Sequence, residues 1–336
     1  MILPRNTEYE VFSVDGKRHT LGAMFLLNHK SVFTAGAPPV GLIAAQAHGE
    51  GALIDLDKHS WPWSMMLVPI AKVDLYELSN NSVWRTEFGF KTSAVPWADY
   101  MSVETDGAGM TERGWLDFGF ENYYTLLNCG FRLQPTAGTA SGVHPVPLGY
   151  SRVYADVEGN FSSDAWLQAL KVGRSFVTNG PMLIARANGK THGHVFASDD
   201  SVTLQIDGEA WFDHPLAGVE LIKNGRAEPV SAYSEETTNG VFRLRFSAPV
   251  TVEETSWIAL RCFENRTDGR VRFAHTSPWH IEIGKQSIRP RKVEVAYLIE
   301  RMKREIARSN GVLHDDAMAE FQKALEIYEA IASRAR

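Results

Sequence analysis

Residues 121–181 decide the fold, and they read ENYYTLLNCGFRLQPTAGTASGVHPVPLGYSRVYADVEGNFSSDAWLQALKVGRSFVTNGP. Apolar residues at helical spacing before Gly130 predict a helix that ends at this glycine. A short strand, a glycine-rich loop, a second strand, a second helix after Ser162 and a third strand follow in order. Strands that alternate with helices, with loops at the strand ends, are typical of α/β enzymes.

The same alternation extends towards the N-terminus. A helix is predicted from residue 39 or 40 to residue 46, then a buried strand through ALIDLD, then a strand over residues 73–78. Residues 82–120 form a long connection rich in aromatic side chains, including Trp84, Phe88, Phe90 and Trp97. Connections of this length in compact domains are usually functional, so we expect a lid over the strand ends.

The pattern changes after Pro181. Short alternating strands separated by Asn-Gly and Asp-Gly turns predict an immunoglobulin-like β-sandwich over residues 181–285. Helical periodicity returns in residues 286–336, where two amphipathic helices are expected to form an antiparallel pair. The sequence therefore predicts three parts, with an α/β unit over residues 1–180 ahead of the sandwich and the helix pair.

Composition excludes several classes of protein. The 336 residues carry a net charge of −6 and 44% hydrophobic residues, which gives no basic field for nucleic acid. No run approaches the roughly 20 apolar residues that span a bilayer, and the first six residues are no signal peptide. A cytoplasmic location is the default expectation, with export if an upstream segment is missing. The two cysteines, Cys129 and Cys262, form no Cys-x-x-Cys motif.

The stretches YYTLLNCGFRL, RVYADVEG and WLQALKVGRSFVTNGPML resemble the second half of a PHP metallohydrolase domain, closest to its CehA/McbA-like branch. The resemblance runs from about Gly22 to the end of the chain and is densest over residues 72–189. It implies a partial, distorted β/α barrel of PHP type that is incomplete at the N-terminus. It also implies a divalent metal at the carboxyl ends of the strands, where the metal would activate a water molecule for hydrolysis.

Matching this family position by position implies a metal site with altered ligands. His59 and Glu77 stand where the family has ligands, and the implied ion is zinc, manganese or iron. Ala23 and Ala140 stand where a His and an Asp are usual. His144 follows the altered loop and is the candidate for a substitute ligand or a proton shuttle.

Each of these residues also has a purely structural interpretation. His59 lies in a tryptophan-rich segment and could pack there, Glu77 could pair with Arg85 or Arg132, and His144 could be a surface loop residue. A weaker metal-type spacing occurs in His192-Gly193-His194. His275, Trp279 and His280 are expected to pack where the α/β unit meets the sandwich.

Two functions follow from the sequence. The first is a metal-dependent hydrolase that acts on a small-molecule ester, carbamate or phosphoester. The second is a catalytically degenerate descendant that binds a ligand or partner, which the alanines at ligand positions favour. An incomplete barrel also leaves a sheet edge, so residues 7–28, the aromatic connection or a second copy of the chain in a homo-oligomer should cover it.

Overall fold

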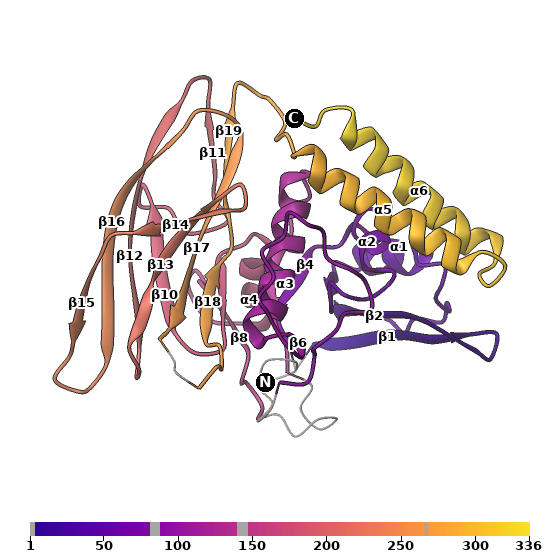
Figure 1. Cartoon of the computed structure of the whole chain (residues 1–336), viewed down its shortest axis with the longest axis horizontal. Helices are drawn as coiled ribbons and strands as arrows, with labels where there is room; N and C mark the ends of the chain where they lie inside the picture. The colour runs from indigo at the N-terminus through magenta and orange to yellow at the C-terminus, as the bar shows by residue number, and fades with distance from the viewer. Residues whose placement is uncertain (1–3, 81–87, 140–146, 266–267) are drawn as a thin grey trace.

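A computed structural model describes residues 4–80, 88–139, 147–265 and 268–336 of the chain. These residues form a mixed α/β structure with six α-helices and no closed barrel. In Figure 1 the sheets after residue 181 form one side of the molecule, and the first sheet and the C-terminal helices form the other. The expected α/β class is confirmed at this level, whereas a barrel of PHP type stays a prediction.

The first sheet has the strand order β1-β2-β3-β4-β7. Its strands are β1 Arg5–Val14, β2 Lys17–His29, β3 Leu53–Leu56, β4 Leu75–Ser79 and β7 Gln134–Ala137. Strands β3, β4 and β7 run parallel, whereas β2 pairs antiparallel with both β1 and β3. The N-terminal hairpin therefore covers the edge of the parallel strands, which confirms the expectation for residues 7–28.

Four α-helices and one π-helical segment lie between β2 and β9 Ser175–Thr178, and the last of these helices follows the first sheet. They are α1 Gly41–Gly49, α2 Ser64–Leu67, η1 Val68–Lys72, α3 Glu112–Asn128 and α4 Ser163–Lys171. Helix α3 begins nine residues before the predicted start at residue 121, because the Thr111 hydroxyl accepts a hydrogen bond from Gly114 N at 3.0 Å and caps the helix. Within the aromatic connection, only a short hairpin, β5 Thr105–Asp106 with β6 Gly109–Met110, precedes α3 in its described part.

Two further sheets follow, one of four strands and one of eight. One contains β10 Met182–Ala187, β12 Val202–Phe212, β16 Phe242–Val252 and β15 Ala232–Glu236. The other contains β11 Val195–Ser198, β19 Trp279–Ile283, β17 Ser256–Glu264, β18 Phe273–Thr276, β9 Ser175–Thr178 and β8 Arg152–Ala155, with β13 Leu216–Lys223 and β14 Arg226–Val230 attached through β17. Apolar residues from both sheets form one core. Packed β-sheets are thus present as expected, and their immunoglobulin-like character stays a prediction.

The eight-stranded sheet extends into the region that the sequence assigns to the α/β unit. β9 pairs with β18 on one side and with β8 on the other, and both pairs are antiparallel. A continuous sheet therefore crosses residue 180, where the sequence places a division, and the division into three parts stays a prediction. Strands β8 and β9 connect the two parts of the molecule through backbone hydrogen bonds.

The expected pair of C-terminal helices is present as α5 Lys292–Ser309 and α6 Asp315–Ala332, which lie side by side in Figure 1. They pack on the first half of the chain. The Tyr328 hydroxyl of α6 donates to Met65 O at 2.7 Å, and α6 also contacts η1. None of the described helices is both long enough and apolar enough to cross a bilayer.

Candidate functional site: a buried carboxyl and lysine cluster

Three side chains lie close together at the carboxyl ends of the parallel strands. Asp55 of β3, Glu77 of β4 and Thr136 of β7 lie on adjacent strands, with Glu77 opposite Thr136. The Thr136 hydroxyl lies 2.9 Å and 2.8 Å from the two carboxylate oxygens of Asp55. Asp55 and Glu77 are only 5% and 7% exposed, so both carboxyl groups are shielded from water.

Lys58 supplies the positive charge of this cluster. Its Nζ donates to Oδ1 and Oδ2 of Asp57 at 2.7 Å and 2.6 Å, and Trp61 Nε1 donates to Oδ2 at 2.9 Å. Asp57 follows the end of β3 by one residue and is 3% exposed. One buried carboxylate is therefore neutralised by an adjacent ammonium group, and both of its oxygens have protein partners.

The remaining carboxyl groups of the cluster hold protons more tightly than usual. Burial, followed by the negative charges of Asp57 and Asp55, keeps the pKa of Glu77 well above its usual range. Burial also raises the pKa of Asp55 to about 7, and the Asp57 charge adds to this effect. Glu8 of β1 joins the cluster from the surface, with a pKa raised to about 7 by burial and by Asp57. We name Glu8, Asp55, Asp57, Lys58 and Glu77 the strand-end cluster.

The His59 ring packs against aromatic side chains. Its ring centroid lies 5.1 Å from that of Trp115 and 4.9 Å from that of Phe118, both on α3. Burial, with the nearby charges of Arg301 and Lys58, lowers the pKa of His59 to about 3. Its Nε2 atom is buried and has no hydrogen-bond partner among the residues that the structure describes.

Arg301 of α5 fixes the backbone of this loop from the other side. The guanidinium is buried and donates to His59 O at 3.0 Å and to Trp61 O at 2.9 Å. Two carbonyl groups beyond the end of β3 are thus satisfied by a helix that lies more than 200 residues later in the chain. The position of the strand-end cluster therefore depends on the C-terminal helix pair.

The predicted metal ligands are only partly brought together. In the four described segments, no group of three or more His, Cys, Asp or Glu residues is arranged to hold a metal ion. No hydrogen bond joins His59 to Glu77 there, and His144, like Arg85 and Ala140, lies outside these segments. The alternative pairing of Glu77 with Arg132 is wrong, because Arg132 forms an ion pair with Glu282.

The divalent ion that the family resemblance implies does not fit the described donors. The oxygens of Asp57 accept from Lys58 and Trp61, Asp55 accepts the single proton of the Thr136 hydroxyl, and the His59 ring lies among aromatic side chains. Metal ligands need free lone pairs directed at one point. The partly exposed Lys58 ammonium group has a third N–H beyond the two donated to Asp57, and this donor suits hydrogen bonding to a polar molecule.

The other histidines have structural surroundings. His275 contacts Tyr124 of α3 through Nε2 at 2.9 Å, which confirms its expected place where the two halves meet. His192 is buried beside Trp279, whereas His194 packs on Phe196, so this pair forms no joint site in the described part of the chain. Sequence reasoning missed Lys58 and Glu8 as members of the cluster. The only available signal was the position of Lys58 between Asp57 and His59.

Comparison with known proteins adds no assignment. No protein-family model matches the chain, and a search of curated proteins gave no match.

Gly138 gives a direct test of how tightly the cluster is packed. A Cβ atom at this position would lie 2.0 Å from Oε1 of Glu77. We expect Gly138→Ala to lower the free energy of unfolding by about 1–2 kcal/mol, because the buried carboxyl group must turn away. Urea denaturation measures this, with Gly36→Ala as the control, since a Cβ atom there meets nothing within 4 Å. Equal stability of both variants would contradict tight packing around Glu77.

Proposed function

We propose that this protein is a ligand-binding module on a hydrolase-like scaffold and that it works without a catalytic metal. The observation that carries the proposal is the Lys58 ammonium group, which donates to both oxygens of Asp57 in the middle of the carboxyl groups. An ammonium in this place balances the buried negative charge for which a metal ion would otherwise be needed. The ligand class is a small polar molecule with hydroxyl or amino groups.

The charge state of the cluster supports this ligand class. Burial raises the pKa of Glu77 and so favours its protonated form, which can donate a hydrogen bond, whereas Asp57 accepts. Lys58 is 16% exposed along its side chain and Glu8 is exposed, so water and solutes reach this side of the cluster. Buried polar groups that are costly to maintain are common at binding sites.

Metal content and hydrolysis test the proposal together. The purified protein should contain less than about 0.1 equivalent of zinc, manganese or iron per chain, since the described donors are occupied. After these metals are added back, a generic phosphoester and a carboxylic ester should be hydrolysed no faster than in a blank. About one equivalent of metal with turnover would overturn the proposal.

A second candidate, a metal-dependent hydrolase, is favoured by one observation. The buried Nε2 atom of His59, three residues beyond the end of β3, has no hydrogen-bond partner in the described part of the chain. In this function His59, Glu77 and His144 would hold the ion, which would supply an activated water for ester, carbamate or phosphoester hydrolysis. Glu77→Gln should then abolish metal binding while the protein stays folded.

Lys58→Met distinguishes the two candidates through stability. Removal of the ammonium leaves Asp57 with Trp61 as its hydrogen-bond donor, and we expect a loss of roughly 1–2 kcal/mol, because the pair is partly exposed. Manganese should then raise the melting temperature of the variant but not of the wild type. Lys303→Met, at an exposed position of α5, is the control. An equal manganese effect on wild type and variant would mean that Lys58 does not replace a metal charge.

A further inference from the structure

Two hollows lie where the eight-stranded sheet, which contains β17 and β19, meets the end of α3 and the C-terminal helices. One encloses about 370 Å³ and the other about 360 Å³. Three segments contribute to both hollows, through residues 254–256, residues 285–289 with 291, and residues 334 and 336. The end of α3 also contributes to both, through Leu127 and Asn128. We name this pair of hollows the seam groove.

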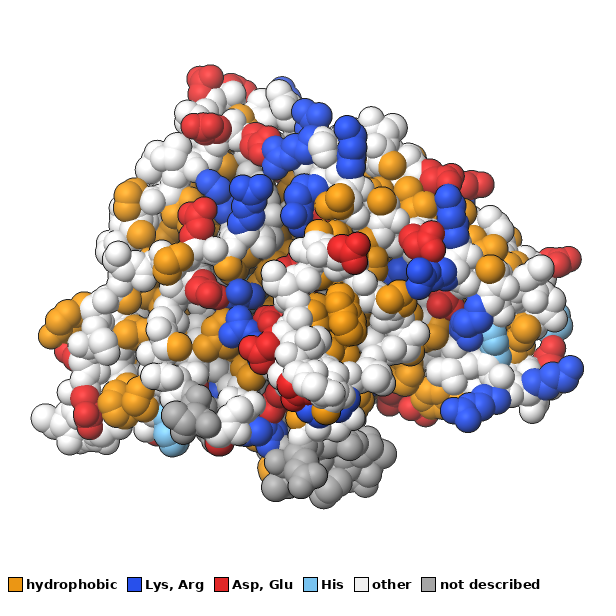
Figure 2. Space-filling model, viewed as in Figure 1, with side chains coloured by type: hydrophobic (Ala, Val, Ile, Leu, Met, Phe, Trp, Pro, Cys, Tyr) orange, Lys and Arg blue, Asp and Glu red, His pale blue; other side chains and the backbone are white. Residues whose placement is uncertain are grey.

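The seam groove is strongly basic in an acidic chain. Its lining carries eight cationic and three acidic side chains, an excess of +5, whereas the whole chain has a net charge of −6. The cationic residues are Arg132, Lys223, Arg226, Lys285, Arg289, Arg291, Arg334 and Arg336. Figure 2 shows lysine and arginine side chains gathered at the top of the molecule, between the sheets and the helices.

The three acidic side chains already have partners. Glu282 pairs with Arg132, Glu254 with Arg336 and Glu294 with Arg291. The five remaining cations are Lys223, Arg226, Lys285, Arg289 and Arg334, and none of them has an acidic partner within 4.0 Å in the described part of the chain. Arg334 donates to Cys129 O at 2.8 Å, which orients its guanidinium without neutralising it. This cationic excess is available to a ligand.

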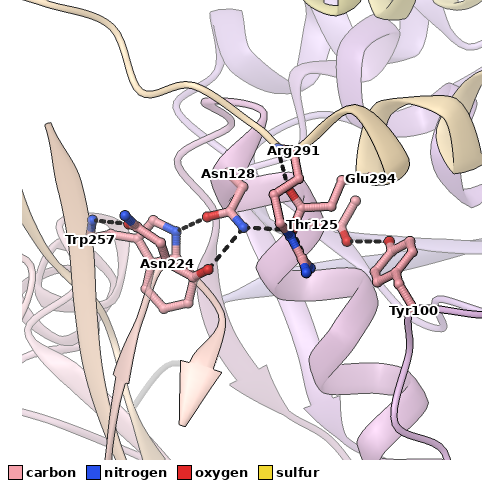
Figure 3. A network of polar contacts seen from close by, with 7 residues as sticks. All are labelled: Tyr100, Thr125, Asn128, Asn224, Trp257, Arg291 and Glu294. Carbon is pink, nitrogen blue, oxygen red and sulfur yellow. Dashed lines mark hydrogen bonds and ion pairs between the residues drawn. The ribbon is translucent and has the colours of Figure 1, made fainter. Parts of the chain in front are cut away.

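A connected hydrogen-bond network holds the floor of the groove (Figure 3). The Asn128 amide nitrogen donates to Glu294 Oε1 at 2.8 Å, and its oxygen accepts from Trp257 Nε1 at 2.8 Å. Glu294 is 1% exposed and also accepts from the Arg291 side chain at 2.8 Å. The network joins α3, β17 and the start of α5, so the three elements that border the groove are held together by hydrogen bonds.

His280 lines the larger hollow, but its Nε2 atom is inaccessible to water and makes no hydrogen bond within the described residues. A ligand in the groove does not reach this atom, so the basic lining, and not His280, points to a bound molecule.

We propose that the seam groove binds a small polyanion with two or more phosphate groups. Guanidinium groups match the oxygen geometry of phosphate, and Arg226, Arg289 and Arg334 provide three such groups without acidic partners. The hollows have the size of small-molecule sites, whereas nucleic acid contacts phosphates along an extended track. This site shares no residue with the strand-end cluster.

Titration calorimetry with inorganic tripolyphosphate tests the proposal on the full chain. We expect one equivalent to bind with a dissociation constant below about 1 mM, weakening as sodium chloride is raised. The double variant Arg226→Ala, Arg289→Ala should bind at least about tenfold more weakly, because both removed side chains are exposed cations of the groove. A second double variant, Arg18→Ala with Lys303→Ala, removes two exposed cations elsewhere and should bind as the wild type does.

Three outcomes would overturn the proposal. Absence of binding by wild type, or an equal loss in both double variants, would mean that the groove is no phosphate site. A 20-nucleotide single strand provides a third outcome. If it binds more tightly per phosphate than tripolyphosphate does, and if the groove variant no longer binds it, the surface would be assigned to nucleic acid instead. Thermal unfolding of each variant without ligand establishes that weaker binding does not arise from loss of the fold.

Discussion

Replacing Trp257 by alanine is expected to lower the free energy of unfolding by about 3–5 kcal/mol, the usual cost of removing a buried tryptophan. Trp257 is fully buried, and its ring lies 5.2 Å from that of Tyr124 on α3. Its Nε1 donates to Asn128, which in turn bonds Glu294, so the substitution leaves a cavity and an unsatisfied amide oxygen. Urea denaturation followed by circular dichroism measures the loss.

Two further variants separate the contributions to this loss. Trp257→Phe keeps much of the volume but removes the donor to Asn128, so its cost should fall between those of wild type and Trp257→Ala. Trp97→Ala is the control, because Trp97 is 38% exposed and its removal should cost much less. If Trp257→Ala were no more destabilising than Trp97→Ala, the contact between α3 and the eight-stranded sheet would not contribute to stability as we infer.

The second large effect is a pH dependence of the free energy of unfolding that arises from His275. Burial lowers the pKa of His275 to about 3, and its neutral ring donates from Nδ1 to Thr276 O and accepts from Tyr124 at Nε2. The unfolded chain has a histidine pKa of about 6.5 and therefore binds a proton first as pH falls. The stabilising contribution of the neutral ring is complete above pH 6.5 and is lost as pH falls towards 3.

His275→Gln should remove this loss. Between pH 7 and pH 5, the free energy of unfolding of the wild type relative to the variant should fall by about 2 kcal/mol. This figure follows because each pH unit below 6.5 changes the free energy of unfolding by about 1.36 kcal/mol. The wild type is compared with the variant because buried carboxyl groups such as Glu121, with a pKa raised to about 7, stabilise both proteins as pH falls. Their contribution cancels in the difference between the two proteins. Tyr124→Phe is the control, since it keeps the imidazole, and its difference from wild type should stay constant. A constant difference for His275→Gln would contradict a buried neutral ring.

Much of the fold could be predicted because its signals are local. The periodicity of α5 and α6 and the Asn-Gly turns between later strands depend on residues close in sequence. The start of α3 could not be placed as well, because Gly114 and Gly119 weaken the helical pattern in its first half. The partner of β9 was out of reach for another reason, since Thr178 pairs with Ala274 almost a hundred residues later.

For the candidate site, the family resemblance implied His59, Glu77 and His144 as its residues. Parallel strands bring their carboxyl ends to one edge, and Glu77 and Asp55 lie there on neighbouring strands. The contact of Lys58 with Asp57 depends on the path of the chain after β3, where strand alternation no longer applies. The place of His59 among the aromatic residues of α3 depends on a helix whose beginning the sequence pattern did not indicate.

The anchoring of the strand-end loop by Arg301 has a consequence for how the protein is made. Its partners, the carbonyl groups of His59 and Trp61, leave the ribosome about 240 residues before the arginine does. The loop therefore spends most of translation without its final partner, and the cluster at its base reaches its mature geometry only as synthesis ends. A nascent chain that stops before α5 should accordingly be a client for chaperones rather than a working shorter form.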